Sequence, residues 1–162
     1  MLEAILAGKI ATEDLHHAGE LITAKLGRSL AVRHLDAGSC NACDFEMGAL
    51  SNPVYDLHRY GISFVASPRH ADLLMVTGAV TRNLEQALRM TYEAMPEPRL
   101  VMACGDCAIS GEPFCGSYAV VGPASAVVPV DIVVPGCPPR PADMLAALCQ
   151  AADMLEERLK NS

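Results

Sequence analysis

Short apolar runs separated by polar turns recur along the chain and predict buried β-strands. Two of them, residues 71–77 and 99–104, are almost continuous, which is typical of strands covered on both faces of a parallel sheet. Strands are predicted at residues 30–35, 61–65, 71–77 and 99–104, with one or two further β segments between residues 127 and 134.

Two amphipathic stretches predict helices between and after these strands. The first begins at Thr81 and ends before Pro96, and its apolar residues recur at helical spacing: Leu84, Leu88, Tyr92 and Met95. The second begins at Pro141, which suits the first turn of a helix, and its expected inner face carries Leu145, Leu148, Ala152 and Leu155.

The alternation of strands with helices predicts an α/β domain over residues 30–162 with a mostly parallel sheet. Residues 1–29 are expected to form an N-terminal helical extension that ends at Gly27. Ligands of such folds bind in loops at the carboxyl ends of the strands. Several cysteines follow predicted strands, so this edge of the sheet is the expected functional site.

The composition excludes several classes of protein. With 51% hydrophobic and 19% charged residues and a mean hydropathy of +0.25, the chain is not intrinsically disordered. A net charge of −7 and the absence of tryptophan argue against nucleic-acid binding. The longest apolar run, residues 144–149, is far shorter than a membrane span, and the first residues lack a signal-peptide pattern. We therefore expect a cytoplasmic chain that reaches a membrane only through partners.

Seven cysteines are many for 162 residues and, without an export signal, indicate metal chemistry rather than disulfides. Cys40 and Cys43 are spaced so that both sulfurs can reach one centre. Cys107 and Cys137 each follow a predicted strand and are framed by glycine or proline. Four thiolates from three loops suit either a 4Fe–4S cluster or a tetrahedral zinc ion.

The other cysteines have simpler interpretations. Cys149, beside the inner face of the last helix, and Cys115 are expected to be structural. Cys104 forms a second C-x-x-C with Cys107, but a redox pair would open a helix, which the glycines and proline after Cys107 disfavour. A zinc site could instead use two C-x-x-C pairs, Cys40 with Cys43 and Cys104 with Cys107. The separation of these two pairs along the chain is much wider than in zinc ribbons.

Several motifs in order along the chain identify a family. Residues 38–46, Gly-Ser-Cys-Asn-Ala-Cys-Asp-Phe-Glu, resemble the cluster loop in small subunits of membrane-bound, energy-converting (hydrogenase-4 or formate-hydrogenlyase type) NiFe hydrogenases. Further segments resemble this family and its relative, the 20 kDa subunit of respiratory complex I: residues 67–73, 76–78, 95–99, 105–111 and 130–139. The resemblance covers residues 30–155.

This resemblance implies a flavodoxin-like, doubly wound sheet with one 4Fe–4S cluster bound by loops at the carboxyl ends of its strands. By position, the implied ligands are Cys40, Cys43, Cys107 and Cys137. Cys107 rather than Cys104 fills the family position because it precedes an Ala-x-Ser-Gly segment. Asp106 stands where relatives usually carry a small or neutral residue.

The resemblance further implies an oxidoreductase subunit that performs no bond chemistry itself. Its cluster would pass electrons between a ferredoxin-like iron–sulfur subunit or soluble donor and the active site of a hydrogenase-type or complex I-type large subunit. The complex would place the chain on the cytoplasmic side of the inner (plasma) membrane, held there through partner subunits. The C-x-x-C spacing favours the hydrogenase branch, whereas Glu46-Met47 and residues 95–99 are closer to complex I, which reduces a quinone.

A few polar residues are candidates for supporting roles. Glu46, three residues after Cys43, is either a proton-coupled carboxylate near the cluster or a helix-start carboxylate favoured by the helix dipole. The resemblance puts Arg69 near the cluster or a subunit interface, and a surface position is the alternative. Three histidines are expected to be hydrogen-bonded or solvent-facing rather than ligands: His34, His58 and His70.

Overall fold

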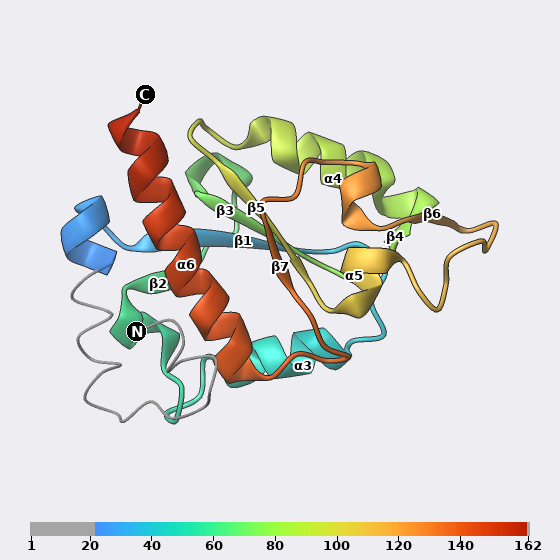
Figure 1. The fold of residues 1–162 in the computed structure, drawn as a ribbon, viewed down its shortest axis with the longest axis horizontal. Helices are drawn as coiled ribbons and strands as arrows, with labels where there is room; N and C mark the ends of the chain where they lie inside the picture. Colours follow the sequence, from blue (N-terminus) through green and yellow to red (C-terminus); the bar gives the residue numbers. More distant parts are fainter. Residues whose placement is uncertain (1–21, 162) are drawn as a thin grey trace.

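A computed structural model describes residues 22–161, and within this range the centre of the fold is a sheet of five parallel strands (Figure 1). The strands are β1 (Leu30–Asp36), β2 (Ile62–Phe64), β3 (Leu73–Thr77), β5 (Leu100–Cys104) and β7 (Ile132–Val134). Their spatial order is β2-β1-β3-β5-β7. Counted along the chain, this is the 2-1-3-4-5 order of flavodoxin-like folds, and the predicted fold class is confirmed.

Helices and short turns connect the strands. The α-helices are α3 (Ala42–Ala49), α4 (Arg82–Ala94), α5 (Asp106–Ser110) and α6 (Pro141–Lys160). Single 3₁₀ turns are η1 (Leu57–Tyr60), η2 (Pro68–His70) and η3 (Ala124–Ala126). A small antiparallel pair joins β4 (Val80–Thr81) to β6 (Val120–Gly122). None of the helices described between residues 22 and 161 has the length and hydrophobicity to span a membrane.

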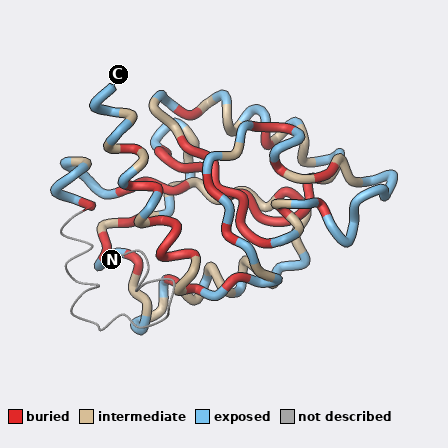
Figure 2. Tube along the Cα trace, in the orientation of Figure 1, coloured by how far each residue is buried: buried red, intermediate tan, exposed pale blue. Residues whose placement is uncertain are grey.

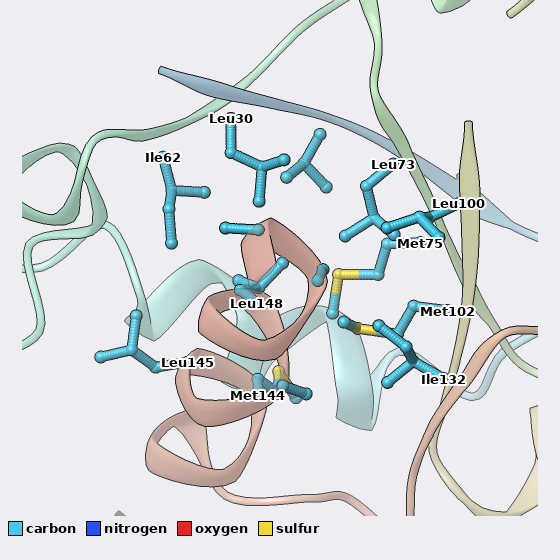
Figure 3. Packing of buried hydrophobic residues seen from close by; sticks show 14 of the residues in the cluster. Leu30, Ile62, Leu73, Met75, Leu100, Met102, Ile132, Met144, Leu145 and Leu148 are labelled. Atoms are coloured by element: carbon cyan, nitrogen blue, oxygen red, sulfur yellow. The ribbon is translucent and has the colours of Figure 1, made fainter. Parts of the chain in front are cut away.

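The sheet separates two hydrophobic cores. Side chains alternate along β3, so that Leu73 and Met75 enter one core while Leu74 and Val76 enter the other. The first core is covered by α6, whose Leu148 is fully buried against the strands (Figure 3). The second core contains the one buried residue of α4, Leu88. The buried parts of the chain therefore concentrate along the strands and the inner face of α6 (Figure 2).

The main elements lie where the sequence predicts them. Each predicted strand is found within two residues of its expected ends, and residues 127–134 supply one strand, β7, rather than two. Thr81 is the N-cap of α4, and Pro141 opens α6. The predicted extension over residues 1–29 lies mostly outside the described residues, of which 22–26 are helical, and Gly27 follows with a φ of 66°.

The apolar pattern of the sequence does not predict the two helices near the cysteines. Helix α3 contains no buried residue, so it lacks the apolar periodicity by which sequence analysis recognises helices. Helix α5 has only five residues and begins at Asp106, directly before Cys107. The expectation that no helix opens at the Cys104–Cys107 pair is therefore wrong, because the glycines and proline after Cys107 lie beyond the end of this short helix.

Candidate metal centre

The topology brings the four predicted ligand cysteines to one edge of the sheet. Cys40 and Cys43 follow β1, Cys107 follows β5, and Cys137 follows β7. The last residues of the parallel strands lie in register, since Asp36 pairs with Thr77, Thr77 with Cys104, and Cys104 with Val134. The loops that leave these strands therefore emerge side by side.

The three loops meet at Gly105, two residues before Cys107. A Cβ atom added at this position would lie 2.7 Å from Cys43 Sγ and 3.5 Å from the carbonyl oxygen of Gly136. The backbone of Gly105 also has a φ of 92°, a conformation that side-chain-bearing residues rarely adopt. Glycine at this position thus leaves the space that the Cys43 sulfur occupies.

Hydrogen bonds fix the Cys107 loop to the Cys137 loop. The Gly105 N–H donates to the Val134 carbonyl over 2.8 Å, and the Asp106 N–H donates to the Gly136 carbonyl over 2.9 Å. In return, the Gly136 N–H donates to Asp106 Oδ1 over 2.7 Å. Asp106 is therefore a bridge between two cysteine-bearing loops.

The loop between β1 and Cys40 is fixed by its own carboxylate. Asp36 Oδ1 accepts hydrogen bonds from the N–H groups of Gly38 (2.8 Å) and Ser39 (2.6 Å). Partial burial alone would raise the pKa of Asp36, but these backbone donors, together with the Ser39 side chain and the nearby His34, outweigh it, and the net shift is downward. A Cβ at Gly78, after β3, would lie 2.3 Å from the Ser39 nitrogen, so the neighbouring loop packs directly on this one.

Two of the four thiols, those of Cys43 and Cys107, have raised pKa values. Burial, followed by the proximity of Cys107, Cys40, Asp44 and Cys137, raises the pKa of the Cys43 thiol to about 11. Burial, followed by Cys137 and Cys40, raises the pKa of the Cys107 thiol. Without a nearby cation these two thiols stay protonated at neutral pH. A bound metal centre would supply the positive charge that stabilises the thiolates.

The donor set fits an iron–sulfur cluster chemically. Iron–sulfur clusters are held by soft sulfur ligands, and three loops here offer four of them. Because Gly105 has no side chain, the Cys43 sulfur has room between these loops. Among residues 22–161, no three cysteine, histidine or acidic side chains converge as they would around a single metal ion.

The remaining cysteines lie in three different environments. Cys104 is fully buried at the end of β5, where burial, followed by the neighbouring Cys43, raises its pKa to about 12. Cys149 packs against the α6 core, and burial, followed by the nearby Asp153, raises its pKa to about 11, in accord with a structural role. Cys115 is exposed and lies in the exposed segment 112–119, so it does not occupy a position in the core.

The predicted supporting residues are not all brought to the centre. Glu46 lies half-buried on α3, and its carboxylate has no hydrogen bond or ion pair within residues 22–161. Arg69 is exposed in η2, which precedes β3 and thus lies at the opposite edge of the sheet from the cysteines. His34 is hydrogen-bonded, as expected, with Nε2 2.9 Å from Thr77 Oγ1. His58 and His70 are exposed.

The centre is open on its outer side. Cys40 and Cys137 are exposed, whereas Cys43 and Cys107 are half-buried. A hollow of about 470 Å³ lies beside Cys137 and is lined by Asp106, Ile109, Ser110, Glu112 and Pro113. Large apolar side chains also project from the adjoining segments into solvent, with Phe45 78% exposed, Phe114 44% and Tyr118 90%.

Comparison with protein families finds a match over most of the chain. The profile of the family described as "NADH ubiquinone oxidoreductase, 20 Kd subunit" matches residues 40–151, a span that includes the four cysteines. The chain belongs to this family. The family resemblance expected from the motifs is therefore confirmed.

Members of the family with high similarity are subunits of larger complexes. The chain is 43% identical over 135 residues to the "Probable membrane-bound hydrogenase subunit mbhJ" of Pyrococcus furiosus, covering 83% of this chain and 81% of that protein. It is 41% identical to formate hydrogenlyase subunit 7 of Escherichia coli K12, of which it spans 53%. The chain thus covers about half of the Escherichia coli relative.

Solved structures extend the comparison to the fold. A chain of the membrane-bound sulfane sulfur reductase, an archaeal respiratory membrane complex, is 32% identical with a TM-score of 0.70, covering 86% of this chain and 76% of that one. A chain of an NAD⁺-reducing [NiFe]-hydrogenase is 19% identical with a TM-score of 0.54, covering 70% and 85%, and shares the fold alone.

Proposed function

We propose that this chain is an electron-transfer subunit that holds one 4Fe–4S cluster on Cys40, Cys43, Cys107 and Cys137. The cluster would relay electrons to or from the large-subunit active site of a membrane-associated NiFe-hydrogenase-like complex. The observation that supports this most strongly is the meeting of three cysteine loops around Gly105, with Cys43 Sγ in the space that a side chain there would fill.

In this proposal the chain holds and tunes the centre rather than transforming a substrate. A bound cluster supplies one-electron transfer, while the protein contributes thiolate ligation, hydrogen bonds and burial. The Asp36 carboxylate orders the loop to Cys40, and Asp106 bridges the loops of Cys107 and Cys137. These contacts hold the ligand loops in place, which limits structural rearrangement when the electron count changes.

The exposed side of the centre is the proposed docking surface for the large subunit. A relay needs its redox partner close to the cluster, and a partner over Cys40 and Cys137 would exclude water from it. The exposed rings of Phe45, Phe114 and Tyr118 suit such a contact, because large apolar groups in water mark interaction sites. Sibling subunits, including a ferredoxin-like electron donor, would then hold the chain on the cytoplasmic side of the membrane.

A complex-I-like role, in which the electrons reach a quinone, is the second candidate. The family profile that matches residues 40–151 is that of the 20 kDa subunit of NADH ubiquinone oxidoreductase. The C-x-x-C at Cys40 and Cys43 favours the hydrogenase-type role. The two roles share the cluster and differ in the reaction at the large subunit.

Elemental analysis of the complex purified through an affinity tag on this chain distinguishes these roles. Iron together with stoichiometric nickel supports the hydrogenase-type role, and iron without nickel supports the quinone-linked one. Zinc with no iron would contradict a cluster on these cysteines altogether.

A further inference from the structure

A hydrogen-bonded group of polar side chains lies beneath the Cys43 loop. His34 from β1 and Thr77 from β3 approach each other, with His34 Nε2 2.9 Å from Thr77 Oγ1. The Thr77 hydroxyl donates to Asp44 Oδ1 over 3.2 Å. The Ser39 hydroxyl donates to the other carboxylate oxygen, Oδ2, over 3.1 Å. Two strands, one loop and helix α3 therefore meet at the carboxylate that directly follows Cys43.

These contacts hold the Asp44 carboxylate in one orientation. Each of its two oxygens accepts a hydroxyl donor, and its side chain is only 23% exposed. Thr77, which supplies one donor, is fully buried in β3 and is therefore itself fixed. A hydrogen-bonded carboxylate on a buried support keeps its charge at a constant distance from the neighbouring sulfur.

The charge of this carboxylate is not cancelled within the described part of the chain. Its one basic neighbour is His34, whose Nε2 lies 3.2 Å from Asp44 Oδ1. Burial lowers the pKa of His34 more than the nearby Asp44 and Asp36 raise it, so the imidazole is neutral at neutral pH. His34 is hydrogen-bonded to Thr77, and the Thr77 hydroxyl donates to Asp44.

The fixed carboxylate lies next to one of the proposed ligands. Asp44 directly follows Cys43 in the chain and lies in the first turn of α3. Its hydrogen bonds to Ser39 and Thr77 keep it at this place. A fixed negative charge near a ligand sulfur disfavours the addition of an electron to the centre that this sulfur holds.

We propose that the Asp44 carboxylate, oriented by Ser39 and Thr77, lowers the reduction potential of the centre that Cys43 helps to hold. The inference rests on the proposed function, because it requires a redox centre on the four cysteines. Asp44 acts as a positioning and tuning residue and is not itself a ligand. Fixed charges and hydrogen bonds around the ligands are the means by which proteins set such potentials.

The alternative is a purely structural role. Asp44 lies in the first turn of α3, where an acidic residue stabilises a helix through its dipole. A structural carboxylate would change the stability of the chain when removed and would leave the reduction potential unchanged. The potential is therefore the quantity that separates the two roles.

The test is an EPR-monitored redox titration of the complex purified through this chain. In Asp44→Asn, which keeps the shape and removes the charge, the midpoint potential of the centre should rise while the iron content stays at the wild-type value. Thr77→Val keeps the carboxylate but removes its buried donor, so the shift should be smaller and accompanied by a changed EPR line shape. Glu156→Gln is the matched control, because its side chain is also 23% exposed but lies near the far end of α6.

Each outcome decides the inference. A wild-type potential and line shape in both Asp44→Asn and Thr77→Val overturns it, as does an equal shift in Glu156→Gln. If Asp44→Asn does not retain iron, Thr77→Val decides the inference by itself. An unshifted potential and an unchanged line shape in that variant then overturn the inference. A wild-type complex without an iron centre on this chain contradicts the proposed function itself, which is a separate result.

Discussion

Asp106 and Gly136 exchange two hydrogen bonds between the loops of Cys107 and Cys137. The Asp106 N–H donates to the Gly136 carbonyl over 2.9 Å, and the Gly136 N–H donates to Asp106 Oδ1 over 2.7 Å. Two of the four proposed ligands are thereby held as one rigid unit. The remaining two belong to the separate segment around α3.

Removing the Asp106 side chain should loosen this unit. Asp106→Ala deletes the bond to Gly136 and should cost about 1 kcal/mol of local stability. We expect faster loss of iron to a chelator, with the same iron content at the start. Glu112→Ala is the control, since Glu112 is an exposed carboxylate that lines the same hollow. Equal release rates in the two variants would show that the bridge does not hold the centre.

A methyl group at Gly105 should displace Cys43. In Gly105→Ala the added Cβ would lie 2.7 Å from Cys43 Sγ, at a φ of 92° that alanine rarely adopts. The variant should lose most of its iron as measured by elemental analysis and visible absorption. Gly48→Ala on α3 has no atom within 4 Å of the new Cβ and should keep its iron, with equal or slightly higher stability.

The Asp36 carboxylate should make part of the stability depend on pH. Its pKa in the folded chain is lowered from the ordinary 3.8, because the backbone N–H donors of Ser39 and Gly38, with the Ser39 side chain and His34, together outweigh the effect of burial. A lowered folded pKa contributes stability above the unfolded pKa, and this contribution is lost as the pH falls through the folded value. The difference in free energy of unfolding between wild type and Asp36→Asn should therefore be constant near pH 7 and shrink below about pH 4. Urea titrations across this range measure it, and a difference that grows on acidification would oppose the assignment.

The periodicity of apolar residues was sufficient to predict the main elements. β3 and β5 are buried on both faces, and the expected inner face of α6 is buried, so burial and sequence pattern coincide there. Helix α3 is different, because it has no fully buried residue and begins after Asn41, whose φ is 69°.

The cysteine-bearing loops could be predicted from the sequence, but their contacts could not. Spacing and resemblance single out Cys40, Cys43, Cys107 and Cys137 as candidate ligands, and the sheet register brings their loops together. The bond from Gly136 to Asp106 and the bond from Thr77 to Asp44 join residues 30 and 33 positions apart. Such contacts depend on the register of separate strands, which no local pattern encodes.

The core beneath α6 should dominate the stability of the domain. Leu148 is fully buried between α6 and the sheet, and its truncation to alanine should lower the free energy of unfolding by about 2–5 kcal/mol. Leu159→Ala, on the same helix but 46% exposed, should cost less than about 1 kcal/mol. Urea unfolding of the two variants gives the comparison, and similar losses would contradict the arrangement of this core.

The most direct test of the proposed cluster compares the iron content of two cysteine variants. In the complex purified through this chain, Cys107→Ser should remove a 4Fe–4S centre, lowering iron by about four atoms per complex. Cys149→Ser, in the α6 core, should leave iron at the wild-type level. Equal iron in both variants, or zinc in place of iron in the wild-type complex, would contradict the assignment of the cluster to these four cysteines.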